Sequence, residues 1–330
     1  MGFIKHQIPP FFRRRTFSDK LSDTTDFITA NWRPLLKMLT VVILPICTIM
    51  VLCFRGILST YGQLYNSNDQ TGMIAKFTLY VVVMIILLII SSLLVTSIVY
   101  ALIKLYHATN EDGTPVNENL SKMTIKEFMP YARQQMGATL KSIFAYIWCF
   151  ALITIVAMII FFVLRNFIPE SLLILIIQGC FYALLIPAMF LLPVYSFEHI
   201  GLFSGIRKAI VYGFKTWRGI FAVYFVFYII VYIISGFCSL PFIITLFLKL
   251  FFATGNVDNL AFTSSIWFNF VCYLTAIFAL YAIFVCGTAM LIAIAYQYGH
   301  ACSALDIDNF DHEDKDFDDF DKDATNEDNF

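Results

Sequence analysis

Residues 77–103 read FTLYVVVMIILLIISSLLVTSIVYALI, an apolar stretch that contains no charged side chain. An α-helix of about 20 residues, at about 1.5 Å per residue, crosses the hydrocarbon core of a bilayer. A helix on the surface of a soluble domain would instead carry polar residues along the side that faces water. The stretch therefore predicts a transmembrane helix and indicates that lipid is the main solvent of this chain.

Five further stretches have the same character. Together with the first they predict six spans, at about 35–54, 77–103, 143–163, 172–195, 220–240 and 267–296. Of the whole chain, 59% is hydrophobic and only 14% is charged, whereas soluble domains carry about 25% charged residues. The sequence predicts an all-α fold, a polytopic membrane helix bundle.

The basic residues predict how the bundle is oriented. Sixteen Lys and Arg fall in the N-terminal segment and in the second and fourth loops, whereas the other side has four: Arg55, Lys76, Arg165 and Lys249. Short loops rich in Lys and Arg stay in the cytoplasm. With an even number of spans, both termini are expected to be cytoplasmic.

The order of these features indicates three pseudo-repeats, each with a cytoplasmic amphipathic helix, an outward span and a returning span. The amphipathic helices are expected at about 17–32, 122–137 and 200–217, where apolar residues recur every three or four positions. Two of them end in an aromatic-basic pair directly before a span. These pairs, Trp32-Arg33 and Trp217-Arg218, are predicted to lie at the membrane interface.

A family resemblance rests on Phe17-Ser18-Asp19-Lys20-Leu21 and on Asn31-Trp32-Arg33-Pro34-Leu35. An amphipathic helix that leads through such a pair into a span, repeated in a six-span chain, resembles bacterial families related to the membrane domain of glycerophosphodiester phosphodiesterases. The resemblance covers most of residues 12–300. It implies a bacterial inner-membrane module, and it implies no catalytic activity because the catalytic domain of those enzymes is not expected here.

Three histidines follow the returning spans: His107, His199 and His300. A threefold arrangement would bring them together as a metal or phosphate site. The alternative is that each one sits at a helix C-terminus, where a partly cationic group suits the helix dipole. The second interpretation is favoured, and no cofactor or metal is expected. The eight cysteines are interpreted as small apolar helix residues.

Residues 304–330 form an acidic tail with 12 acidic and 2 basic side chains. Too few apolar residues are present to fold a core, so residues 301–330 are predicted to be disordered. Isolated aromatic side chains could dock a cytoplasmic protein partner: Phe310, Phe317, Phe320 and Phe330. The tail could also fold back on the basic residues of the chain, or serve only as a solvated end.

The preferred functional prediction is a non-enzymatic multi-pass membrane protein that organises lipid or partner proteins through its interfacial helices and tail. The absence of Asp, Glu and Arg from the six spans argues against ion-coupled transport. A permease or lipid-translocating protein is the alternative, with a pathway lined by Ser91, Ser92, Thr96, Ser97 and Gln178. A membrane enzyme with a histidine site is third. No nucleic-acid partner is expected.

Overall fold

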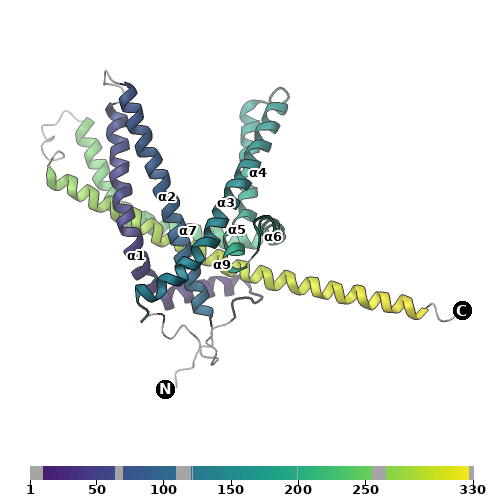
Figure 1. Ribbon diagram of the computed structural model, residues 1–330. Coiled ribbons are helices and arrows are strands. Elements are labelled where there is room, and N and C mark those ends of the chain that lie inside the picture. The colour runs from purple at the N-terminus through teal and green to yellow at the C-terminus, as the bar shows by residue number, and fades with distance from the viewer. Residues whose placement is uncertain are drawn as a thin grey trace. The chain divides into compact units, whose positions relative to one another are not determined.

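The computed structural model describes residues 10–63, 70–108, 120, 122–198, 200–254 and 265–326, with the backbone alone beyond residue 305. These described residues form helices and no strand. In chain order the helices are α1 Phe17–Gln63, α2 Gln70–His107, α3 Ile125–Leu164, α4 Glu170–Ala188, α5 Leu191–Phe197, α6 Leu202–Lys215, α7 Trp217–Thr254 and α9 Ile266–Asn326 (Figure 1).

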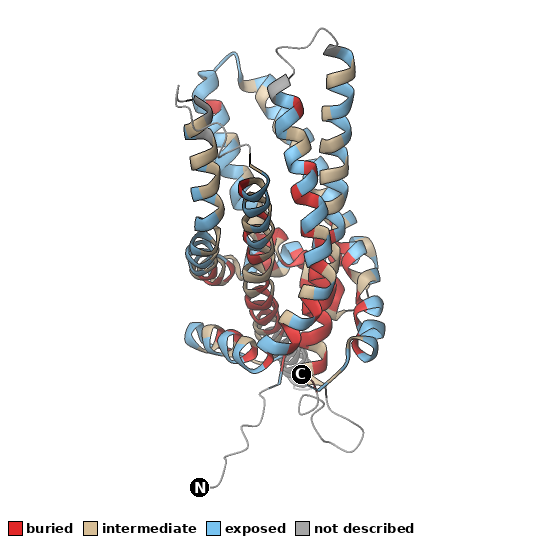
Figure 2. Cartoon of the chain, turned by 90° about the vertical axis from the view of Figure 1, so that its left-hand side faces the viewer, coloured by how far each residue is buried: buried red, intermediate tan, exposed pale blue. Residues whose placement is uncertain are grey.

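Six helical segments are long and apolar enough to cross a membrane, which confirms the predicted helical multi-span fold. They lie in α1, α2, α3, the α4–α5 pair, α7 and α9. Much of their apolar surface is exposed, as the pale blue stretches of Figure 2 show. The most apolar window of α3 contains no buried residue at all. Exposed apolar surface of this extent requires a non-aqueous partner, and a lipid bilayer supplies one.

The described chain divides into two compact units. The first unit draws on Met1–Asp26, Lys141–Tyr224 and Ala293–Phe330, and the second on Phe27–Leu140 and Phe225–Ile292. Several helices therefore contribute one part to each unit. Each unit is described by itself below.

In the second unit, small polar groups and close aromatic contacts join the helices. Ser91 Oγ of α2 lies 3.8 Å from Met50 Sδ of α1, and the Tyr80 ring packs directly against Gly56. Thr40 of α1 and Tyr281 of α9 share a hydrogen bond of 2.5 Å. Such bonds satisfy hydroxyl groups where water is scarce.

In the first unit, α6 packs against α4 and α5. Its buried residues, Gly205, Ala209 and Gly213, recur every fourth position and so share one helix face. A Cβ atom at Gly213 would lie 2.6 Å from the Cα atom of Pro187, which is closer than any side chain tolerates. The small residues on this face are therefore what lets the helix backbones approach.

The predicted amphipathic segments have different outcomes. Residues 200–217 include the separate helix α6, whereas 17–32 and 122–137 are continuous with spans inside α1 and α3. On α6 the large apolar side chains Phe203 and Phe214 are exposed, on a different side from the small buried residues. The short apolar stretch 241–252 extends α7.

The helical backbone of α9 continues through Asn326, into the tail for which disorder is predicted. A helix that extends an existing one avoids the cost of nucleation. Acidic residues also precede Lys315 and Lys322 by four positions in this segment, a spacing that favours helix. Phe330 lies outside the described residues.

Candidate functional site

The first unit contains a cavity of about 540 Å³ where the N-terminal region, the junction of α6 with α7, and α9 meet. Among the described residues that line it, three carry positive charge, Lys20, Lys215 and Arg218, and none is Asp or Glu. The other lining residues are Phe214, Thr216, Trp217, Gly219, Gln297 and His300. An excess of fixed positive charge without a counter-ion from the lining favours an anionic ligand.

The break between α6 and α7 forms one wall of the cavity. Thr216 ends α6 with an N–H that donates to the Tyr212 carbonyl at 3.0 Å, and its own carbonyl accepts the Gly219 N–H at 2.9 Å. Residue 216 thus closes one helix and starts the next.

The N-terminal segment before α1 holds the opposite wall against α9. The Arg15 N–H donates to His300 Nδ1 at 3.0 Å, and the Arg15 guanidinium lies over the Tyr296 ring at 5.1 Å. A Cβ atom at Gly299 would meet the Phe11 carbonyl oxygen at 2.6 Å, so glycine permits this close approach. Because His300 Nδ1 accepts a hydrogen bond, a neutral ring carries its proton on Nε2 and retains one donor.

Arg15 itself is neutralised within this segment. Its side chain has no exposed area, and its Nε donates to Asp23 Oδ2 at 2.7 Å. Burial lowers the pKa of the Arg15 guanidinium, and the Asp23 carboxylate opposes that effect. Asp23 also pairs with Arg13 at 2.9 Å. The acidic group of this region is therefore directed at Arg13 and Arg15 and is not among the residues that line the cavity.

Gln297 lies at the centre of the site. It has no exposed area, and within the described part of the chain neither its Nε2 nor its Oε1 has a hydrogen-bond partner. A Cβ atom at Gly219 would lie 2.7 Å from Gln297 Nε2, so the glycine makes room for the amide. A buried amide without a partner costs about 1–3 kcal/mol, which a ligand could recover by accepting its N–H groups.

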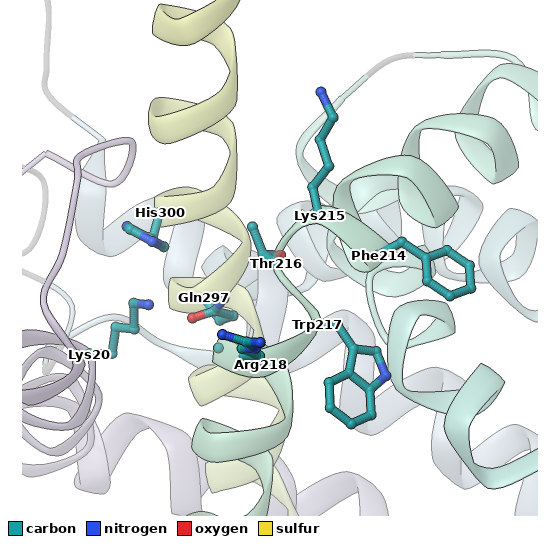
Figure 3. Close-up of a pocket in the computed structure, with 9 residues that line it drawn as sticks. Lys20, Phe214, Lys215, Thr216, Trp217, Arg218, Gln297 and His300 are labelled. Carbon is teal, nitrogen blue, oxygen red and sulfur yellow. The ribbon is translucent and has the colours of Figure 1, made fainter.

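Figure 3 shows how these side chains lie. Lys20, His300, Gln297 and Arg218 gather around the same space, whereas Lys215 extends away from them. Each of these four side chains has N–H groups that can donate hydrogen bonds: an ammonium, an imidazole, an amide and a guanidinium. This set fits a phosphate group, because phosphate oxygens accept several charge-assisted hydrogen bonds at once.

Of the three histidines predicted as weak metal candidates, the structure describes two. His300 lines the cavity of the first unit, and His107 ends α2 in the second unit, beside the Tyr106 ring. His199 lies outside the described residues. Across the described ranges, no three His, Cys, Asp or Glu side chains come together as metal ligands.

The residues predicted to lie at the membrane interface have different surroundings. Trp32 is 49% exposed, with Arg33 over its ring at 5.2 Å. The Trp217 indole N–H donates to the Ala183 carbonyl at 3.2 Å, so this side chain is tied to α4. Arg218 lines the cavity. Phe310, Phe317 and Phe320 lie on the helical backbone of α9, where side chains are not described.

Three of the polar residues predicted to line a pathway, Ser91, Ser97 and Gln178, make contacts within the protein. Ser91 contacts Met50, and Ser97 Oγ donates to Thr139 Oγ1 at 3.1 Å. Gln178 is bonded to Tyr182 of its own helix at 3.3 Å. None of these residues lines the cavity, so they do not favour the translocation alternative.

Sequence reasoning missed Lys20, Lys215 and Gln297 as members of one site. The signal for Gln297 was present, since it is an amide at the end of a long apolar run in which residues 270–296 hold no charge. Lys20 and Arg218 are almost 200 positions apart, and only the tertiary structure brings them together.

The fold and the exposed apolar helices define a multi-pass helical membrane protein. Comparison with known proteins found no matching family model, no similar curated protein and no similar solved structure. The resemblance to the membrane domain of glycerophosphodiester phosphodiesterases therefore stays a prediction from the sequence.

Proposed function

We propose that this chain is a non-enzymatic membrane protein that binds phosphate-bearing lipid headgroups at the cytoplasmic surface and thereby organises lipid around it. The observation that carries the proposal is the buried amide of Gln297, which has no partner in the described part of the chain and lies in a cavity whose described lining includes cations and no acidic residue. A phosphodiester would accept hydrogen bonds from the amide and from Lys20 and Arg218, and its charge would offset theirs.

The surroundings of the cavity favour a lipid as the source of the phosphate. Phe214 lines the cavity and is 52% exposed, and it lies on α6 with the exposed side chains Phe203 and Ile210. These three residues are spaced by seven and four positions, so they form one apolar stripe. Such a stripe next to basic groups is typical of helices that lie in the headgroup region of a membrane.

The test is lipid binding by the purified full-length chain in a neutral detergent. Native mass spectrometry would compare phosphatidylglycerol, whose headgroup is a phosphodiester with net negative charge, with uncharged dodecanoylglycerol. We expect phosphatidylglycerol to bind preferentially. Lys20→Gln and Arg218→Gln should each weaken that binding about tenfold, the loss of one charge-assisted hydrogen bond.

The matched control is Arg207→Gln. Arg207 is an exposed cation on α6 that does not line the cavity, so its loss should leave the affinity within about twofold if binding is local. Equal weakening by Arg207→Gln and Lys20→Gln would mean that lipid senses only the overall charge. That result would contradict a defined headgroup site.

The proposal includes a bacterial inner-membrane location with both termini in the cytoplasm. It is supported by the sixteen-to-four distribution of Lys and Arg around the spans. Compartment reporters inserted in the loop 109–119 and at Phe167 should give opposite signals, because one span separates them. The same signal at both positions would contradict this topology.

The acidic tail is proposed to engage a cytoplasmic protein through charge and isolated phenylalanines. Residues 304–330 carry a strong negative excess, 12 acidic against 2 basic side chains. Deleting 306–330 should abolish cytoplasmic protein interactions found by crosslinking while leaving phosphatidylglycerol binding unchanged. Interactions that persist in full would remove the tail from this function.

A further inference from the structure

The second unit contains another cavity, of about 520 Å³, between α1, α7 and α9. We propose that it binds one phosphate-headed lipid, with the head at Arg55 and Lys249 and an alkyl chain along the apolar wall. This site goes beyond the proposed function, because it shares no described lining residue with the cavity of the first unit, here called the cytoplasmic pocket after its proposed location, and because its basic residues are assigned to the opposite membrane side.

Two cations from different helices define the head end. Arg55 of α1 donates a hydrogen bond to the Tyr273 hydroxyl and lies over its ring at 5.0 Å. Lys249 Nζ of α7 donates to Asn269 Oδ1 at 3.3 Å. Both partners are neutral, and none of the described residues that line the cavity is Asp or Glu. Within the described ranges the two positive charges are thus held in place by α9 without a carboxylate partner, and an anion would neutralise both.

Spare donors remain on both cations. A guanidinium has five N–H donors and an ammonium has three, and one hydrogen bond from each is accounted for by Tyr273 and Asn269. A phosphate head has enough acceptor oxygens to engage both groups together. A single carbonyl or hydroxyl head would leave the charges uncompensated.

The rest of the cavity is mainly apolar. The wall is formed by side chains from three helices: Val51, Phe54, Leu58, Phe242, Leu246 and Ala276. A free hydrated phosphate gains nothing from this wall, whereas an alkyl chain removes its own surface and that of the wall from water. The volume falls in the range of about 300–1,000 Å³ found for small-molecule sites. A charged head combined with an apolar chain is therefore the ligand chemistry that fits both ends.

The sequence positions of the two cations support a binding role. Lys249 is the only charged residue between Arg218 and Asp258, and Arg55 is the only one between Lys37 and Asp69. Both residues follow predicted spans, 35–54 and 220–240, and are assigned to the same membrane side, where the long stem of a basic side chain lets its charge reach a lipid headgroup. Here both lone cations line the same cavity.

The probe is dodecyl phosphate, with inorganic phosphate and dodecanol as its separate parts. Each would be titrated against the full chain in maltoside detergent, with bound molecules counted by native mass spectrometry. We expect dodecyl phosphate to bind at least tenfold more tightly than either part. If inorganic phosphate bound as tightly as dodecyl phosphate, the cavity would be a site for free anions. If dodecanol bound as tightly as dodecyl phosphate, the cavity would be an apolar groove without an anion site. Either result would overturn the proposal.

Variants locate the site. Arg55→Gln and Lys249→Gln should each weaken dodecyl phosphate binding about tenfold, and Ala276→Phe should weaken it by filling the apolar end. Arg165→Gln is the matched control, because Arg165 is an exposed cation assigned to the same membrane side that does not line the cavity. Unchanged binding in Arg55→Gln and Lys249→Gln would overturn the proposal.

Folding and the cytoplasmic pocket are controlled separately. The charge-preserving variants Arg55→Lys and Lys249→Arg should retain binding if charge and not a particular shape is required. Lys20→Gln removes a cation of the cytoplasmic pocket. It should not affect the part of dodecyl phosphate binding that is lost in Lys249→Gln. If Lys20→Gln abolished all binding, the ligand would occupy only the cytoplasmic pocket, and the second site would be refuted while the proposed function stood.

Discussion

Replacing Gln297 by Met should stabilise the empty protein and at the same time remove its response to lipid. The amide of Gln297 is fully buried and has no hydrogen-bond partner among the described residues. A thioether of similar length carries no such penalty. The free energy of unfolding should therefore rise by about 1–3 kcal/mol, the cost of leaving a buried polar group unpaired.

The lipid response is expected to change in the opposite direction. At a concentration of 100 times Kd, a ligand that binds only the folded state adds about 2.7 kcal/mol to its stability. Wild-type protein should show this gain with dioctanoyl phosphatidylglycerol, whereas Gln297→Met should lose most of it. Plotted against lipid concentration, the unfolding free energies of the wild type and of Gln297→Met would then cross.

The assay is reversible unfolding in mixed micelles, followed by tryptophan fluorescence, with and without the lipid. Asn31→Leu is the matched control, because the buried Asn31 amide already donates to the Phe27 carbonyl at 3.0 Å. Its replacement should not raise the free energy of unfolding. If Gln297→Met instead lowered the stability of the empty protein by more than about 1 kcal/mol, the amide would have a partner in the protein, and the reasoning about this site would fail.

Two further predictions concern packing and charge in the first unit, the first with a comparison position, Gly236, in the second unit. Gly213→Leu should lower the free energy of unfolding by about 1–3 kcal/mol, because the larger side chain overpacks against Pro187. Gly236→Ala should raise this free energy slightly, because nothing lies within 4 Å of the added Cβ. Equal effects of the two substitutions would contradict the close packing of α6. Asp23→Asn should lower the free energy of unfolding by about 3–5 kcal/mol, because it leaves the Arg15 guanidinium buried without its counter-ion. Arg13→Gln removes a partly exposed partner of Asp23 and should lower it by about 1 kcal/mol or less. Thermal unfolding of the two variants in detergent measures the difference.

The six spans could be predicted from the sequence because a bilayer imposes a simple local requirement. A helix of about 20 apolar residues satisfies its own backbone hydrogen bonds, so the hydropathy of each stretch suffices to identify it. Helix boundaries were harder to predict, since helices run past the hydrocarbon region. The amphipathic segment 17–32 and the span 35–54, for example, form one helix through Pro34.

The pairing of residues could not be predicted in this way. Lys20, Arg218 and Gln297 lie in three distant segments, and each one alone is an ordinary interfacial cation or a polar group near a helix end. Their meeting depends on Gly219 and Gly299, whose lack of side chains lets other segments approach α9 closely. Such contacts are a property of packing and leave no periodic signal in the sequence.

The sequence by itself determined the solvent, the helical class and the number of spans, because each of these depends on free energies of transfer that are local to a stretch of about 20 residues. Only the tertiary structure decided which charges share a cavity and which are neutralised by a neighbour. Coulomb and hydrogen-bond energies depend on distances between groups that are far apart in the chain, and folding alone sets those distances.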